Sequence, residues 1–111
     1  MSERIVNSIE GVATSGPFFV ETIAEGNRLV VMRVRLEQGV GSETHAHDHE
    51  SVIFVLEGRV ASVVDGQRFE IGPGESSRHP EHVPHRVEAL EDSVFLEVKS
   101  PAPDLATVLA G

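Results

Sequence analysis

Short apolar stretches with alternating polarity, separated by tight-turn signals, most constrain how this chain can fold. In the stretch 29–36 (LVVMRVRL), Met32, Val34 and Leu36 occupy alternate positions, with arginines between them. This period of two predicts a strand with one buried face. Further strands are expected in PFFVETIA (17–24), VIFVLE (52–57), RVASVVD (59–65), QRFEI (67–71), HRVEAL (85–90) and SVFLEVK (93–99). About eight short strands without a helical period predict an all-β fold, either an antiparallel sandwich or a closed barrel.

Glycine-containing turns indicate where these strands end. Asp65-Gly66 is a two-residue hairpin signal that requires positive φ angles, and 72–74 (GPG) is a second turn. The continuous apolar run 52–57 stops at Gly58, which predicts a strand inside the β core. The tail 100–111 is expected to form either a short helical turn or an edge strand.

Length and charge limit the kinds of partner. The chain has 111 residues, which predicts a single domain over 1–111. Eighteen acidic against nine basic residues give a net charge of −9, so neither nucleic acid nor an anionic membrane surface is expected as a partner. The absence of cysteine excludes disulfides and thiolate metal ligands. Without a signal-like start or an apolar run of about 20 residues, a cytoplasmic protein is predicted.

Half of the six histidines lie within the stretch 45–51 (HAHDHES). On a strand, residues i and i+2 share a face, so His45 and His47 are expected to project together and to bind one ion. His85 begins a separate predicted strand, where a folded barrel would bring a third imidazole to the same ion. His49 has the same parity as His45 and His47, so a third ligand from this loop stays open as an alternative.

Two motifs around these histidines resemble those of the cupin family. The first reads Gly39-VGSET-His45-Ala46-His47-DHE-Ser51-VIFVLE-Gly58, and the second reads Gly74-ESSRH-Pro80-Glu81-His82-VP-His85-RVE-Ala89. The resemblance implies an antiparallel jelly roll, also called a double-stranded β-helix barrel. It further implies a divalent metal ion (Fe, Zn, Ni, Mn or Co) held by His45, His47 and His85, and a homodimer.

The chain departs from the family pattern at Ser51, where the family has a metal-binding glutamate or glutamine. Counted back from Gly58, Ser51 shares a face with Ile53 and Val55, whereas Glu50 faces the opposite way. Glu50 is therefore expected outside the metal's ligands, paired with an arginine or a histidine. Ser51 is expected to hold a metal-bound water.

The other histidines are expected to play lesser roles. His49 is interpreted as lying beside the ligands or at the surface. His79 and His82, which flank Pro80, are expected at the rim of the barrel or in packing.

Three neutral imidazoles leave a divalent ion with a charge near +2 and with open coordination positions. Such a site favours anionic oxygen ligands, including carboxylates, keto acids and dicarbonyls. We therefore predict a metal-dependent enzyme that acts on a small oxygen-rich metabolite by isomerase, lyase or dioxygenase chemistry. The alternative is a non-catalytic cupin that binds a small molecule or a metal as a sensor or carrier.

Glu97 is the predicted catalytic residue, because its alternation with Leu96 and Val98 points it into the barrel, where it could transfer protons. The segment 77–104 also resembles small cupins that convert unsaturated uronate sugars to linear keto forms. In that comparison Lys99 replaces a phenylalanine and Pro103 an arginine.

Overall fold

The computed structural model describes residues 3–103, which form antiparallel strands and no helix. The strands are β1 (Arg4–Ile9), β2 (Val12–Glu25), β3 (Val30–Leu36), β4 (Glu50–Glu57), β5 (Val60–Val64), β6 (Gln67–Ile71), β7 (Ser76–His79), β8 (His85–Ala89) and β9 (Ser93–Ser100). In this part of the chain there is accordingly no helix that could span a membrane. Most of the tail that we expected to be helical or an edge strand lies outside the described residues.

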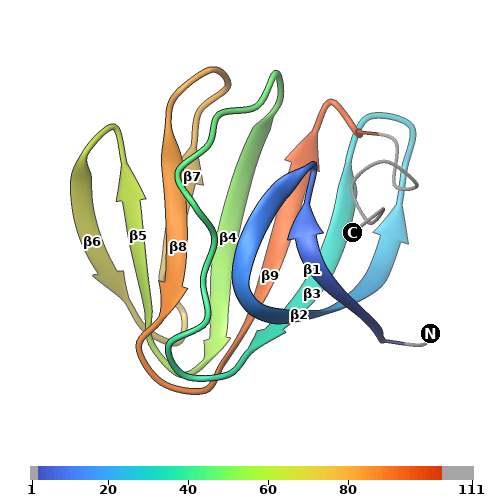
Figure 1. Cartoon of the computed structure of the whole chain (residues 1–111). Coiled ribbons are helices and arrows are strands. Elements are labelled where there is room, and N and C mark those ends of the chain that lie inside the picture. The colour runs from blue at the N-terminus through green and yellow to red at the C-terminus, as the bar shows by residue number, and fades with distance from the viewer. Residues whose placement is uncertain (1–2, 104–111) are drawn as a thin grey trace.

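The strands form two facing sheets (Figure 1). One has six strands in the order β1-β2-β3-β9-β4-β7, and the other has three in the order β6-β5-β8. The segment 37–49 closes one side of the barrel between β2 and β8, where the Ser15 amide donates to Gly41 O at 2.9 Å and the Ser42 amide to Val87 O at 2.9 Å. On the other side, β6 and β7 are the edge strands of their sheets. This arrangement confirms the predicted jelly-roll barrel.

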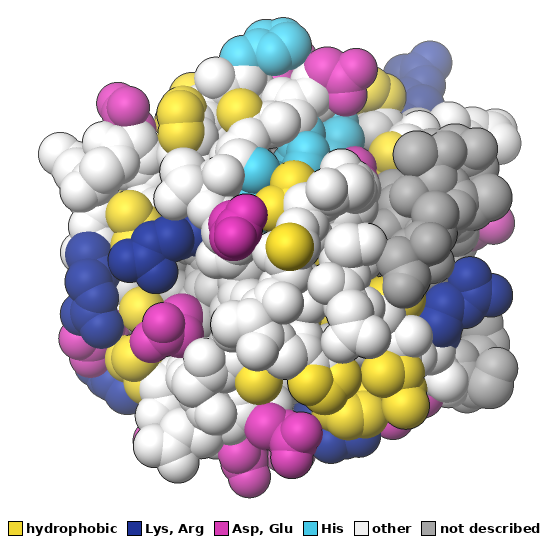
Figure 2. Space-filling model, in the orientation of Figure 1, with side chains coloured by type: hydrophobic (Ala, Val, Ile, Leu, Met, Phe, Trp, Pro, Cys, Tyr) yellow, Lys and Arg dark blue, Asp and Glu magenta, His cyan; other side chains and the backbone are white. Residues whose placement is uncertain are grey.

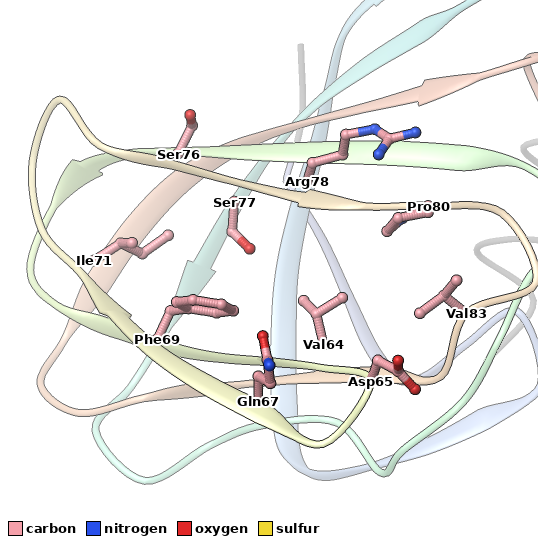
Figure 3. Close-up of a pocket in the computed structure, with 10 residues that line it drawn as sticks. All are labelled: Val64, Asp65, Gln67, Phe69, Ile71, Ser76, Ser77, Arg78, Pro80 and Val83. Atoms are coloured by element: carbon pink, nitrogen blue, oxygen red, sulfur yellow. The ribbon is translucent and has the colours of Figure 1, made fainter.

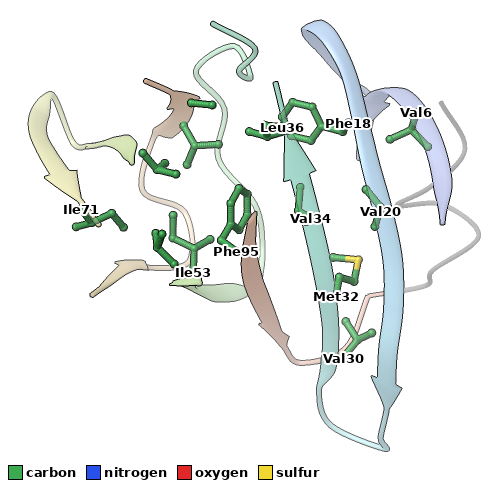
Figure 4. Packing of buried hydrophobic residues seen from close by; sticks show 14 residues of the cluster. Val6, Phe18, Val20, Val30, Met32, Val34, Leu36, Ile53, Ile71 and Phe95 are labelled. Atoms are coloured by element: carbon green, nitrogen blue, oxygen red, sulfur yellow. The ribbon is translucent and has the colours of Figure 1, made fainter. Parts of the chain in front are cut away.

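The inward face of each strand changes from apolar to polar along the barrel. In β3 the predicted alternation is confirmed, with Val34 buried between the exposed arginines Arg33 and Arg35. The apolar core joins both sheets and includes Val6, Phe18, Val20, Val30, Met32, Val34, Leu36, Ile53, Val55, Val60, Ile71, Val87, Ala89 and Phe95 (Figure 4). Toward the end where β4 and β8 begin, the inward residues become polar, as in Ser51 and His85.

The register of β4 is the one predicted, but its burial is only partly so. Ser51, Ile53 and Val55 are buried, whereas Phe54 and Leu56 are 41% and 37% exposed. β4 lies between β9 and β7 inside the six-stranded sheet, as predicted, but only one of its faces is buried, because no further layer of the described chain covers the other. The homodimer expected from the resemblance stays a prediction.

The N-terminal hairpin was missed in the sequence. Its two strands, β1 and β2, are joined by Glu10-Gly11, and both residues have positive φ angles of 51° and 78°. A two-residue turn of this kind is usually signalled by Asn-Gly or Asp-Gly, which is how Asp65-Gly66 was recognised. The Asp65-Gly66 hairpin is confirmed, with φ angles of 51° and 79°.

We predict that Gly58→Ala lowers the free energy of unfolding by about 2 to 4 kcal/mol, because the new methyl group meets backbone in a left-handed conformation. Gly58 has a φ of +85°, and a Cβ there would lie 2.3 Å from Asp92 O. Gly66→Ala is the matched control, since Gly66 has a φ of +79° and nothing within 4 Å. Urea denaturation should show a smaller loss, about 1 to 2 kcal/mol, for the control. Equal losses would contradict the argument from close packing.

Candidate metal centre

The structure brings His45, His47 and His85 together at one end of the barrel. His45 and His85 form a β-bridge, in which each amide donates to the other's carbonyl at 2.9 and 2.8 Å. One ring nitrogen from each of the three residues lies within 4.8 Å of the others. Figure 2 shows histidine side chains gathered at this end of the molecule, with acidic side chains beside them.

The backbone that carries His45 and His47 differs from the expectation. These residues precede β4, which begins only at Glu50, so they lie in an extended loop rather than on a strand. The two rings nevertheless converge, with centroids 4.4 Å apart. The bridge to His85, rather than a regular strand, holds this loop in position.

The hydrogen bonds of the rings leave nitrogen lone pairs for a metal ion. His45 Nδ1 lies 2.6 Å from Glu43 O, and His85 Nδ1 lies 3.1 Å from Val83 O. A carbonyl oxygen can only accept a hydrogen bond, so Nδ1 of each ring must carry the proton. Nε2 of each ring then keeps a free lone pair that can bind a metal ion. Burial lowers the pKa of His45 and lowers the pKa of His85 to about 4, so both are neutral at physiological pH. Imidazole nitrogens that converge in this way fit a divalent ion of the predicted kinds.

Glu10 enters this site from the turn between β1 and β2. Its carboxylate oxygens lie 2.8 Å from His47 Nε2 and 2.7 Å from His49 Nε2, and its side chain is 11% exposed. His47 Nε2 is buried and makes no hydrogen bond. Glu10 Oε2 is close enough, but it does not lie in the direction that a hydrogen bond requires. Burial opposes ionisation of Glu10, but the two histidines and Lys99 hold its pKa below the ordinary value.

Lys99 occupies the neighbourhood of the missing family carboxylate. It is the cross-strand partner of Ser51 between β9 and β4, and it is 1% exposed. Its Nζ lies 3.2 Å from Glu10 Oε2 and 3.6 Å from Glu97 Oε2. A buried lysine is rare unless it is paired, and here it is paired twice. Sequence reasoning noted Lys99 only as a departure from relatives.

Glu97, the predicted catalytic residue, lies inside the barrel next to Lys99. Its side chain is 16% exposed. Burial raises the pKa of Glu97, but Lys99 together with His79 and His85 outweighs this effect and holds the pKa below the ordinary value. At neutral pH Glu97 is therefore a carboxylate, which can accept a proton.

Two histidines take the buried one of the roles expected for them. His79, expected at the rim or in packing, is 1% exposed and stacks on His85 with ring centroids 4.3 Å apart, so it has a packing role. Its ring nitrogens hydrogen-bond with Ser51 Oγ at 3.3 Å and Ser62 Oγ at 3.0 Å. Burial lowers the pKa of His79 to about 4. His49, expected beside the ligands or at the surface, lies beside them: it is 4% exposed and stacks on His47.

The positions of Glu50 and His82 confirm two expectations. Glu50 faces away from the three histidines, and Arg78 Nε donates to Glu50 Oε2 at 2.6 Å. His82 is exposed, with 72% of its side chain accessible. Neither residue contributes to the group of converging ring nitrogens.

A separate cleft of about 510 Å³ opens between the edge strands β6 and β7. Figure 3 shows Phe69, Val64 and Ser77 pointing into it. Ser77 Oγ lies 2.8 Å from Ser62 Oγ, which in turn hydrogen-bonds with His79. The cleft is thus linked by polar contacts to the histidine that stacks on His85.

Comparison with known proteins places this geometry in a family. The family model described as Cupin domain matches residues 32–99. The structure of KdgF from Halomonas sp. is 26% identical, covers 78% of this chain and 81% of its own, and superposes with a TM-score of 0.76. An RmlC-like cupin from Shewanella frigidimarina is 24% identical over 92% of this chain and 86% of its own, with a TM-score of 0.77. At 24% identity, the match to the Shewanella protein shows only a shared fold.

Two further matches add little about function. A predicted oxalate decarboxylase from Thermotoga maritima is 16% identical over 91% of this chain and 93% of its own, with a TM-score of 0.80, and shows only the fold. An uncharacterised protein of Methanocaldococcus jannaschii is 36% identical over 52 residues, or 44% of this chain. That match spans 42% of the length of the curated relative.

Proposed function

Because the chain belongs to the cupin family, we propose that it is a metal-dependent enzyme whose divalent ion is held by His45, His47 and His85. The substrate is a small oxygen-rich metabolite, such as a carboxylate, keto or dicarbonyl compound, and the reaction is an isomerisation, a lyase reaction or a dioxygenation. The convergence of three buried or half-buried imidazoles, two of them with Nδ1 fixed by backbone carbonyls, carries this proposal.

The charges around the histidines support an anionic or enolisable substrate. A divalent ion in such a site acts as a Lewis acid on oxygen ligands and makes bound water more acidic. Lys99, with His79 and His85, keeps Glu97 ionised inside the barrel, so Glu97 serves as the proton acceptor. His79, neutral and fixed between Ser51 and Ser62, holds the ring of His85 in place by stacking.

Metal analysis of His45→Ala and His85→Ala tests this proposal. Each change should lower the affinity for Co²⁺ or Zn²⁺ at least about 100-fold, since one of three protein ligands is lost. Affinity is measured by competition with a chromophoric chelator, and bound metal by mass spectrometry. His82→Ala removes an exposed histidine and should bind as the wild type does. If neither ligand variant loses metal, the three-histidine site is wrong.

A turnover panel separates an enzyme from a binding protein. Unsaturated uronates, keto acids and dicarbonyls are offered to protein loaded with Fe²⁺, Mn²⁺, Ni²⁺, Co²⁺ or Zn²⁺, and product formation and oxygen uptake are followed. Turnover that disappears in His85→Ala supports the enzyme.

The second candidate function is a non-catalytic cupin that binds a small molecule. The cleft between β6 and β7 favours it, because Phe69, Ile71 and Val64 give this cleft an apolar lining away from the three histidines. Metal-loaded protein without turnover, combined with saturable binding of an apolar ligand that Phe69→Ser abolishes, would support this alternative.

A further inference from the structure

We propose that Glu10 supplies the carboxylate ligand that the family pattern places at position 51, so that a bound ion is held by His45, His47, His85 and Glu10. The inference rests on the proposed metal site. It assigns a role to a residue that lies outside both histidine motifs and more than thirty positions before His45.

The backbone at Glu10 points to a function rather than to a structural preference. Glu10 has a φ of 51° in a two-residue hairpin turn, where asparagine, aspartate or glycine is favoured. A side chain with a Cβ costs about 1 to 2 kcal/mol in the left-handed region. Strained conformations of this kind persist where the side chain is needed.

The Glu10 carboxylate already lies beside a ligand nitrogen. Its Oε2 is 2.8 Å from His47 Nε2, yet the direction is unsuitable for a hydrogen bond. Two donors that share an ion at bond lengths of about 2.1 Å lie about 3 Å apart. The spacing between Glu10 and His47 is that of two ligands of one metal. The Glu10 oxygens converge within 4.8 Å with His47 and His49 rather than with His45 and His85, so the carboxylate would turn toward the other two histidines when it binds the ion.

The neighbours of Glu10 hold the carboxylate in position. Its Oε1 accepts a hydrogen bond from His49 Nε2 at 2.7 Å, and Lys99 Nζ lies 3.2 Å from Oε2. His49 is thus interpreted as the group that orients Glu10, in the way that histidine–carboxylate pairs support metal ligands. The carboxylate lowers the net charge of an occupied three-histidine site from +2 to +1.

Ser51 does not supply the carboxylate at the family position. It is buried and hydrogen-bonded with His79, and its short side chain cannot act as a carboxylate ligand. In this chain the acidic ligand would come from the β1–β2 turn, which lies at the same end of the barrel as the starts of β4 and β8 (Figure 1).

The test compares Co²⁺ binding by the wild type and by Glu10→Gln, with two readouts. Affinity, measured by chelator competition, should fall about 10- to 100-fold. The visible absorption spectrum of bound Co²⁺ should also change, because one ligand is replaced. Glu50→Gln is the matched control, since Glu50 is paired with Arg78 on the outer face and should leave both readouts unchanged.

A rescue variant strengthens the test. Ser51→Glu on the Glu10→Gln background restores a carboxylate at the family position. This double variant should bind Co²⁺ at least about tenfold more tightly than Glu10→Gln alone. Thermal melts check that each variant is folded. If Glu10→Gln unfolds, the double variant Glu10→Gln with Lys99→Met removes the buried pair together, and its affinity and spectrum are compared with those of Lys99→Met alone.

Two outcomes overturn the inference while the three-histidine site stands. In the first, Glu10→Gln keeps the wild-type affinity although His45→Ala and His85→Ala lose it. In the second, affinity falls but the Co²⁺ spectrum is unchanged, so Glu10 only positions His47. If His49→Ala abolishes binding and His45→Ala does not, the ion is held instead by Glu10, His47 and His49, whose ligand atoms also lie within 4.8 Å of one another.

Discussion

Lys99→Met is expected to lower the free energy of unfolding by about 3 to 5 kcal/mol, the loss typical of removing one partner from a buried ion pair. Lys99 Nζ lies between two carboxylates, 3.2 Å from Glu10 and 3.6 Å from Glu97, and its side chain is 2% exposed. Methionine matches the aliphatic part of lysine and lacks only the terminal ammonium, so packing changes little and the lost charge dominates. Urea denaturation of the metal-free protein measures the effect.

The double variant Lys99→Met with Glu97→Gln distinguishes charge from packing. Glu97 loses its nearby ammonium in the single variant, whereas Glu10 keeps its contacts with His47 and His49. Neutralising Glu97 should therefore recover a large part of the stability. A double variant as unstable as Lys99→Met alone would show that the loss comes from packing.

Lys99→Met should have the opposite effect on the metal. The ammonium lies beside Glu10, so it adds positive charge close to the proposed ion. Removing it should raise the affinity for Co²⁺ at the same time as it lowers stability. Lys99 would then stabilise the fold and weaken metal binding at the same time.

The sequence predicted the parts of the site that depend on local periodicity. Alternation counted from Gly58 placed Ser51 inward and Glu50 outward, and the burial of Ser51 and the ion pair of Glu50 with Arg78 agree. Motif spacing indicated that His45, His47 and His85 would meet, although the loop before β4 and its bridge to His85 were not foreseen.

The missed residues depend on contacts between distant segments. Glu10 reaches the histidines only because β1 and β2 form a hairpin whose turn lacks the usual Asn-Gly signal. His79 is buried because the four-residue strand β7 pairs with β4, and its sequence SSRH has no apolar alternation to reveal it. Lys99 could have been found, since it shares the inward parity of Glu97 on one strand.

Phe95→Ala is the second change with a large expected effect, a loss of about 3 to 5 kcal/mol in the free energy of unfolding. Phe95 is 1% exposed, and its cross-strand partners in the six-stranded sheet are Val34 and Val55. Alanine leaves a cavity in the apolar part of the barrel that supports Glu97 and Lys99 on the same face of β9. Urea denaturation again measures the loss.

Phe54→Ala is the matched control for Phe95→Ala, because Phe54 precedes Val55 on β4 but faces outward and is 41% exposed. An outward residue should lose no more than about 1 kcal/mol. A loss as large as that of Phe95→Ala would contradict the division of β4 into a buried and an exposed face. If that loss also grew with protein concentration, the outer face of β4 would belong to an interface between two copies of the chain, because only an assembled state couples stability to concentration.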